Sequence, residues 1–229
     1  MAVTLNKIII WGRPFDEYME MFGLSEDDLG KRFLDCASGP ASFNASLTMH
    51  GGHIISVDPI YCLNSDEITI QINEAYNMLI GQLRENMGDF SMGQYNNSAD
   101  EYCQVHINAM KEFLFDYNDG LREGRYIHGS LPKLPFKDDE FDIALVGNLL
   151  FVYSQQLSED FHIQSIIELC RVSPEVRIFP LMEVGIRKPS RYLESVLDKL
   201  SKEGYKAKKV KIQYEFKKGA NEMLQITAV

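Results

Sequence analysis

The chain has 229 residues, of which 45% are hydrophobic and 24% are charged, and its formal net charge at pH 7 is −10. These values are typical of a globular protein with one hydrophobic core, so we expect a single domain over residues 1–229. The acidic balance disfavours nucleic acid as a substrate, because it repels a phosphate backbone. No segment has about 20 uninterrupted apolar residues, so neither a membrane span nor a signal peptide is expected.

Residues 1–30 are expected to form a helical leader ahead of the first strand. Phe15, Tyr18 and Phe22 are spaced so that they share one face of a helix. Gly12-Arg13-Pro14 precedes this pattern and marks the helix start.

Residues 31–61 carry the pattern around which the chain is organised. Residues 31–36 form a short apolar strand ending in a carboxylate, and a small-residue turn, ASGPAS, follows at once. This order predicts the strand, turn and helix start of a nucleotide-binding βαβ unit. A helix over 43–50 and a buried strand over 54–57 then deliver Asp58, about 20 residues beyond the turn. An acidic side chain there accepts hydrogen bonds from ribose hydroxyls, which predicts a ribose-containing cofactor.

The turn indicates which cofactor is favoured. A pyrophosphate requires close backbone N–H groups and a third glycine, but only Gly39 fits the dinucleotide spacing, with Ala37 and Ser42 in the flanking positions. The stretch resembles the first motif of the class I S-adenosylmethionine (SAM)-dependent methyltransferases, an acidic residue followed by alternating small residues and glycines. Asp35, Ala37, Gly39 and Ala41 stand in the positions of that motif, with alanine for glycine at two of them.

Residues 62–124 are too long for a simple connection, so we expect a helical insertion after the second strand. One helix is predicted to begin at a cap on Ser65, and a second is predicted to begin at a capping box over 98–101 and to end at 119–120. The glycine-rich segment 88–97 between them has few apparent apolar anchors, which predicts a mobile substrate loop. The insertion is therefore expected to cover the substrate, although its apolar stripes are also typical of core helices.

The stretch 125–153 also resembles the methyltransferase pattern. Its two predicted strands, 125–128 and 141–146, are separated by a turn at 129–132 and an LPF segment. In that family a polar residue after the third strand meets the adenine amino group, and Ser130 stands where aspartate is common. Residues after the fourth strand resemble those that line the methyl-transfer site.

The C-terminal part predicts how the sheet ends. Residues 175–179 form a fifth strand, and two further strand-like runs over 206–216 and 222–227 are joined by a short loop with glycine, which predicts a hairpin. A dinucleotide-binding sheet would continue parallel, whereas the class I methyltransferase sheet ends in an antiparallel hairpin. We expect an α/β, Rossmann-like domain with a mostly parallel seven-stranded sheet. The lysines over 206–218 alternate between faces and indicate a solvated edge.

The resemblance implies a set of cofactor-binding residues. Arg13 would pair with the cofactor carboxylate through two hydrogen bonds, the alternative being an exposed arginine beside a helix start. The full set is Arg13, Asp35, Ala37, Ser38, Gly39, Pro40, Asp58, Pro59, Gly129, Ser130, Leu131, Asn148 and Leu149.

The sequence contains weak candidates for a catalytic base and none for a metal centre. His128, His162 and Tyr153 fall near the expected strand edges, but no HxxxH or HExxH pattern occurs. The four cysteines have no zinc-type spacing and are expected to be reduced thiols in a cytoplasmic protein.

Three hypotheses for function follow. The first is a SAM-dependent methyltransferase that acts on a small molecule. The second is a SAM-binding or regulatory protein without catalysis, suggested by the alanines in the glycine motif. The third is a dinucleotide or nucleotide-sugar enzyme on a related fold.

Overall fold

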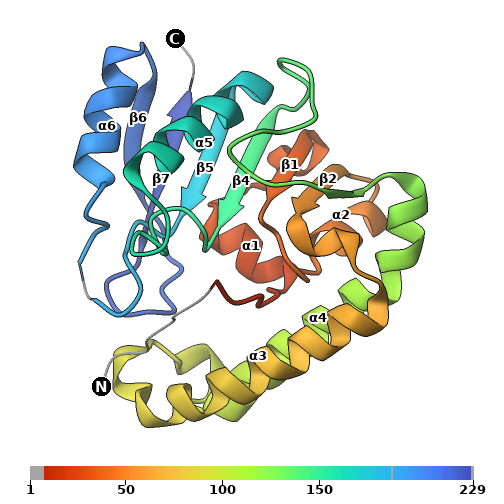
Figure 1. Ribbon diagram of the computed structural model, residues 1–229. Coiled ribbons are helices and arrows are strands. Elements are labelled where there is room, and N and C mark those ends of the chain that lie inside the picture. Colours follow the sequence, from red (N-terminus) through yellow and green to blue (C-terminus); the bar gives the residue numbers. More distant parts are fainter. Residues whose placement is uncertain (1–7, 187, 228–229) are drawn as a thin grey trace.

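Seven strands form one mixed sheet in the computed structural model, which describes residues 8–186 and 188–227. Their order is β3-β2-β1-β4-β5-β7-β6 (Figure 1). The strands are β1 (Arg32–Cys36), β2 (His53–Asp58), β3 (Tyr126–His128), β4 (Ile143–Gly147), β5 (Glu175–Phe179), β6 (Lys206–Lys211) and β7 (Glu222–Thr227). The first five pair in parallel, whereas β7 pairs antiparallel with both β5 and β6. The predicted Rossmann-like α/β fold with a C-terminal antiparallel hairpin is confirmed.

Helices cover both faces of the sheet, because its central strands are apolar on both faces. The α-helices are α1 (Phe15–Met21), α2 (Phe43–Met49), α3 (Ser65–Glu85), α4 (Ala99–Glu123), α5 (Glu159–Val172) and α6 (Leu193–Lys202). In β4, Ile143 and Leu145 cluster with side chains of α1 and α2, whereas Ala144 and Val146 cluster with those of α5 and α6. This alternation is the two-residue period of a strand. Among the described residues, no helix is long and apolar enough to cross a membrane.

The predicted insertion after β2 is a pair of long helices, α3 and α4, that lie side by side (Figure 1). Their connection contains the short 3-10 helices η3 (Met87–Asp89) and η4 (Gly93–Tyr95). It reaches the segment between β6 and β7, where the ring centroids of Phe90 and Phe216 are 4.8 Å apart and the Ser91 N–H donates to the Phe216 carbonyl at 2.7 Å. The insertion thus joins the β2 side of the molecule to the C-terminal hairpin.

The expectation that segment 88–97 has few apolar anchors is wrong. Phe90, Met92 and Tyr95 are 9%, 2% and 6% exposed, respectively. They belong to a cluster with Leu83 and Tyr102 of the two long helices. The segment is therefore packed against the two long helices of the insertion, α3 and α4. The reason for predicting a mobile loop does not hold.

Two predicted helix boundaries in the insertion are also wrong. The N-cap of α3 is Asn64 rather than Ser65, because the Asn64 side chain accepts from two first-turn N–H groups. Helix α4 continues through Gly120 and ends at Glu123, and its C-cap Gly124 has φ of 76°. A Cβ at Gly120 would lie 2.4 Å from the Tyr126 ring, so this glycine provides space for close packing rather than a helix stop.

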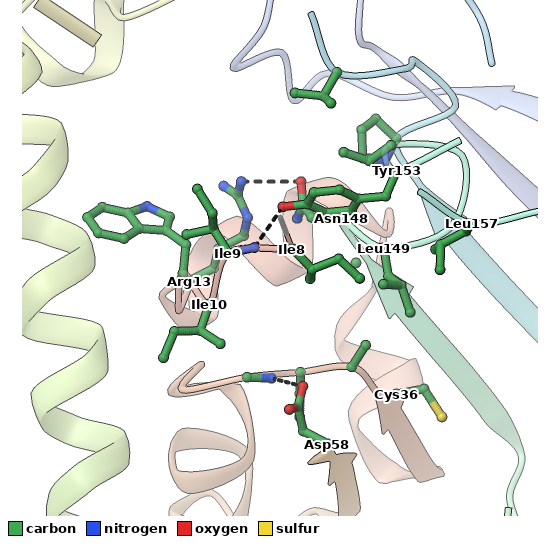
Figure 2. A pocket seen from close by; sticks show the side chains of 18 of the residues that line it. Ile8, Ile9, Ile10, Arg13, Cys36, Asp58, Asn148, Leu149, Tyr153 and Leu157 are labelled. Carbon is green, nitrogen blue, oxygen red and sulfur yellow. Dashed lines mark hydrogen bonds between the residues drawn. The ribbon is translucent and has the colours of Figure 1, made fainter. Parts of the chain in front are cut away.

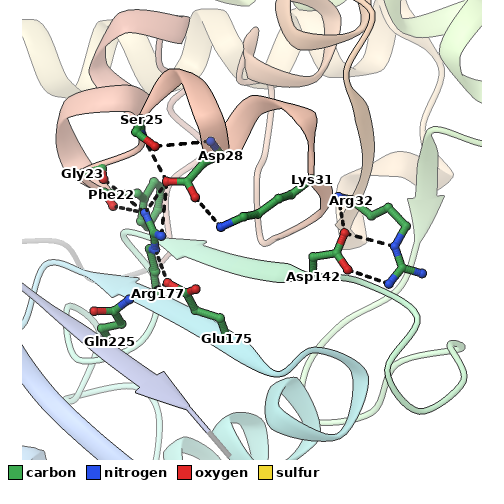
Figure 3. Close-up of polar contacts among 10 residues, drawn as sticks. All are labelled: Phe22, Gly23, Ser25, Asp28, Lys31, Arg32, Asp142, Glu175, Arg177 and Gln225. Carbon is green, nitrogen blue, oxygen red and sulfur yellow. Dashed lines mark hydrogen bonds and ion pairs between the residues drawn. The ribbon is translucent and has the colours of Figure 1, made fainter.

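The leader is held to the amino ends of the strands by a buried arginine (Figure 3). Arg177 of β5 donates to the carbonyls of Phe22 at 3.0 Å and Gly23 at 3.2 Å. Its guanidinium also lies 3.4 Å from Asp28 in the 3-10 helix η1 (Glu26–Gly30) and 2.7 Å from Glu175. A buried guanidinium requires this number of acceptors, so these contacts fix the leader on the sheet.

Candidate functional site

A cavity of about 690 Å³ lies at the carboxyl ends of the parallel strands. It is lined by residues that end or follow β1, β2, β3 and β4, and also by the leader, the insertion and the segment between β6 and β7. Ligands of open α/β sheets bind at this edge, and cavities that hold drug-sized ligands have volumes of about 300–1,000 Å³. The cavity is therefore the candidate site.

The turn after β1 is built to bring its backbone close to the cavity. Ala37 and Gly39 both have left-handed φ, 56° and 55°. The Tyr61 hydroxyl donates to the Gly39 carbonyl at 2.7 Å and lies 2.6 Å from the Ser38 hydroxyl, which holds the turn in place. A Cβ at Gly39 would meet no atom within 4 Å, so the strained backbone faces open space.

Asp58 connects this turn to the end of β2. One carboxylate oxygen accepts from the Gly39 N–H at 2.9 Å, and the other accepts from the Ile60 N–H at 2.9 Å. Burial raises the pKa of Asp58, although the two N–H groups and His128 oppose the rise. A carboxylate has about four lone-pair sites, so both oxygens keep one for a ligand.

Asp35, the last acidic residue of β1, lies beneath the turn. Its side chain is 1% exposed, and within residues 8–186 and 188–227 neither carboxyl oxygen accepts a hydrogen bond of good geometry. Burial raises its pKa well above the usual value, and the charge of Asp58 adds to that rise, while the Tyr18 hydroxyl opposes it.

Arg13 of the leader lines the cavity and binds three groups. Its guanidinium donates to Glu17 at 2.8 Å, to the Tyr214 hydroxyl at 3.1 Å and to the Asn148 side-chain oxygen at 3.3 Å (Figure 2). Its Nε–H is buried and has no partner in the part of the chain that the structure describes. Burial would lower the pKa of Arg13, but Tyr214, Tyr102 and Glu17 outweigh it and the pKa is raised. Arg13 is therefore permanently charged, and the Glu17 carboxylate balances its charge.

Glu17 is the centre of a buried network behind this arginine. Besides Arg13, it accepts from the hydroxyls of Tyr95 and Tyr214, and its carboxylate lies 3.3 Å from the His106 ring. Burial would raise the pKa of Glu17, but His106, Arg13 and Tyr95 together lower it well below the usual value. The network joins the leader, the insertion and the C-terminal hairpin segment around one anion.

The part of the cavity away from the strand ends is lined mainly by apolar side chains. We call the following six residues the outer subsite: Trp11, Leu79, Leu83, Phe90, Tyr102 and Phe216. Residues 8–10 also line the cavity, and the Tyr153 hydroxyl accepts from the Ile9 N–H at 3.1 Å (Figure 2). Leader, insertion and hairpin thus enclose a space beside the strand ends.

The structure brings together most of the residues that the sequence singled out. Those that line the cavity are Arg13, Ala37, Ser38, Gly39, Asp58, Pro59, Gly129, Ser130, Leu131, Asn148 and Leu149. Asp35 and Pro40 do not line it. Asp35 is buried beneath the turn, and the Pro40 carbonyl lies against Gly12 of the leader.

The three weak base candidates have different surroundings. Both ring nitrogens of His162 are engaged, one by the Phe151 N–H at 3.0 Å and the other at 2.7 Å from the Ser158 carbonyl, and burial lowers its pKa. These contacts give His162 a structural role. His128 is exposed and does not line the cavity. Tyr153 does line it, but burial raises its pKa and favours the protonated hydroxyl.

The sequence interpretation missed Glu17, Tyr102 and His106. No motif marks them, because they meet only when the insertion packs against the leader. The apolar run before Gly12 was the available signal for a leader segment inside the cavity. Among the described residues, no group of three or more potential metal ligands is present.

Strand order, antiparallel β7 and the turn-and-carboxylate site together define a Rossmann-like protein with the fold of the class I SAM-dependent methyltransferases. The chain is 38% identical over 225 residues to "Uncharacterized protein MJ0045" of Methanocaldococcus jannaschii, and the match covers 98% of each chain. It belongs to the same family as that protein. No family model matches the chain.

Similar solved structures include three methyltransferases at low identity. A SAM-dependent methyltransferase of Aquifex aeolicus is 13% identical, with 93% of this chain and 87% of that chain covered and a TM-score of 0.44. Magnesium protoporphyrin IX methyltransferase of Synechocystis PCC 6803, with bound SAM, is 11% identical, with 94% and 78% covered and a TM-score of 0.48. A putative RNA methyltransferase of Pyrococcus horikoshii is 14% identical, with 93% and 85% covered and a TM-score of 0.46. No activity is transferred from these similarities.

Proposed function

We propose that this protein is a SAM-dependent methyltransferase that acts on a small molecule. The observation that carries the proposal is the 2.9 Å hydrogen bond from the Gly39 N–H to Asp58. In a dinucleotide site the backbone N–H groups of this turn bind the pyrophosphate. Here one of them is bound to a carboxylate, whose charge repels phosphate and favours ribose hydroxyls and a cationic sulfonium.

The residues around the cavity fit the parts of this cofactor. Asp58 would accept from the ribose hydroxyls, and the apolar wall at Leu131 and Leu149 would hold the adenine. Arg13, whose Nε–H has no partner among the described residues, would bind the methionine carboxylate. These roles extend the residue-by-residue resemblance to class I methyltransferases.

When bound, SAM would supply an electrophilic methyl group, which would pass to the lone pair of the acceptor while the electron pair of the broken carbon–sulfur bond stays on sulfur and any acceptor proton goes to solvent. The protein contributes by orienting the acceptor and excluding water. The insertion and residues 8–12 supply that enclosure. Asn148, held by Arg13, stands at the end of β4, where the reacting atoms would meet.

Calorimetric titration with SAM, its demethylated product and NAD tests the proposal. We expect the first two to bind and NAD not to bind. Asp58→Asn keeps the shape of the side chain but removes its charge, and should lower SAM affinity about tenfold or more, as expected for hydrogen bonds to a charged group. Asp66→Asn, an exposed carboxylate at the start of α3, is the matched control and should leave affinity unchanged. Binding of NAD with no binding of SAM would overturn the proposal.

A second measurement separates a methyltransferase from a binding protein. SAM with a labelled methyl group is incubated with the protein and fractions of small apolar metabolites. We expect release of demethylated cofactor in at least one fraction. Tight SAM binding with no turnover in any fraction favours the non-catalytic alternative.

A further inference from the structure

The outer subsite has an aromatic wall made of four stacked side chains. The centroids of Tyr102 and Phe216 are 4.2 Å apart with an interplanar angle of 8°, and those of Phe90 and Phe216 are 4.8 Å apart at 29°. Trp11 stacks with Tyr102 at 6.4 Å and 21°. Leu79 and Leu83 of α3 also line this space. A wall of this kind favours apolar ligands, and rings in particular.

The hydroxyl of Tyr102 is the distinctive polar group of this wall. It accepts from the Trp11 indole N–H at 3.1 Å, but among the described residues its own hydrogen is donated to no acceptor. Burial raises the pKa of Tyr102, so the hydroxyl stays protonated at neutral pH. A buried hydroxyl that accepts one hydrogen bond and donates none is available to an acceptor atom of a ligand.

Lys217, which also lines the cavity, directly follows Phe216 of this wall in the sequence. Lys217 donates to the carbonyls of Ile186 at 3.0 Å and Glu183 at 3.4 Å. An anionic polymer such as a nucleic acid would therefore have to displace existing contacts, whereas a neutral ring would not.

We propose that the outer subsite binds the methyl acceptor, and that this acceptor is an apolar, ring-bearing small molecule with an oxygen that accepts a hydrogen bond from Tyr102. The identification of this ligand as the methyl acceptor rests on the proposed function. The binding preference itself is independent of SAM and can be measured alone.

The single tryptophan of the chain makes this measurement specific to the site. Protein labelled with 5-fluorotryptophan has one ¹⁹F resonance, from Trp11, which lines the subsite. Acetophenone and α-methylstyrene are suitable probes, since they differ only by a carbonyl oxygen in place of a methylene group. Uridine serves as the polar, nucleoside probe.

In the wild-type protein, acetophenone should shift the Trp11 resonance with a dissociation constant about three- to tenfold lower than that of α-methylstyrene, the value of one neutral hydrogen bond. Tyr102→Phe should bring this ratio close to one and leave α-methylstyrene binding unchanged. Uridine should bind at least about tenfold more weakly than acetophenone. An unchanged ratio in Tyr102→Phe, or uridine binding as tightly as the ring probes, would overturn the inference.

A matched pair on α3 tests the apolar wall. Leu79→Asp places a charge in the subsite and should weaken both ring probes about tenfold or more. Met78→Asp, at a neighbouring exposed position that does not line the cavity, should weaken neither. Equal effects of the two variants would contradict the assignment.

The SAM titration separates failure of this inference from failure of the proposed function. If SAM binds but the ring probes do not shift Trp11, the acceptor class is wrong and the methyltransferase proposal stands. If the ring probes bind as expected but SAM does not, the subsite stands as a binding site for apolar rings and the methyltransferase proposal fails.

Discussion

The two ends of the cavity are constructed differently. At the strand ends, the Asp58 carboxylate accepts a hydrogen bond from the backbone N–H of Gly39 in the turn after β1, about 20 residues earlier in the sequence. The outer subsite and the network behind it join residues 91 positions apart in the Trp11–Tyr102 contact and 197 positions apart in the Tyr214–Glu17 contact. The part of the cavity at the strand ends is thus formed by residues close in sequence. The outer subsite forms only after the leader, the insertion and the segment between β6 and β7 have packed together.

The two buried carboxylates, Asp58 at the strand ends and Glu17 behind the outer subsite, also differ in how their charge is balanced. Burial raises the pKa of Asp58, whose closest partners are neutral backbone N–H groups. Glu17 is equally buried, but Arg13 and His106 outweigh burial and its pKa is lowered. Asp58 is therefore an anion whose environment leaves room for a ligand, and Glu17 is an anion that the protein itself neutralises.

Replacement of Glu17 should be the most damaging change. Glu17→Gln leaves the Arg13 guanidinium buried without its anion, and breaking a buried ion pair costs about 3–5 kcal/mol of unfolding free energy. Urea denaturation followed by circular dichroism measures this loss. Glu20→Gln, exposed on the same helix, should change stability by less than about 0.5 kcal/mol. Similar losses of unfolding free energy in the two variants would show that the Glu17 network does not hold the elements around the outer subsite together.

Gly12→Ala should disrupt the contact between the leader and the turn after β1. A Cβ at this position would lie 2.0 Å from the Pro40 carbonyl oxygen and 2.6 Å from the Met110 side chain. We expect a loss of about 1–3 kcal/mol in stability, typical of overpacking, together with weaker SAM binding. Gly81→Ala in α3, where a Cβ meets nothing within 4 Å, should instead stabilise by about 0.5–1 kcal/mol. A neutral Gly12→Ala variant would mean that the leader can move away from the cofactor turn at little cost.

The pKa of Glu17 predicts an acid-dependent loss of stability. Since its folded pKa is below its usual value of 4.5, the unfolded chain binds the proton more tightly. The contribution of Glu17 is therefore complete above about pH 5 and is lost as pH falls toward the folded pKa. Between pH 5 and pH 3, the wild type should lose about 1–2 kcal/mol more than Glu17→Gln. Parallel pH profiles of the two proteins would contradict this assignment.

Tyr153→Phe should have the smallest effect. It removes the acceptor of the Ile9 N–H and should loosen the leader locally by about 0.5–1.5 kcal/mol. Amide hydrogen exchange by mass spectrometry should show faster exchange over residues 8–12, with exchange in α5 unchanged as an internal control. Faster exchange throughout the sheet would show that the contact supports more than the leader.

Much of the strand-end half of the site could be predicted from the sequence. Asp58 ends a buried strand, Ala37, Gly39 and Asn148 follow buried strands, and parallel strands bring their carboxyl ends to one edge. The C-terminal hairpin was likewise predicted from two strand-like runs joined by a short loop with glycine. The turn residues confer their backbone shape locally, so no knowledge of distant packing was needed.

The outer subsite and the network behind it became apparent only in the tertiary structure. In the sequence, Gly120 had the pattern of a helix stop and segment 88–97 that of a mobile loop, because neither Tyr126 nor the rings that pack on Phe90 are sequence neighbours. Glu17 and His106 likewise had no motif. Side chains that act through packing have no fixed spacing, because any segment of suitable shape can supply the partner. Residues that act through backbone geometry have a spacing set by the strand and the turn, and this is why the sequence alone was sufficient at one end of the cavity and not at the other.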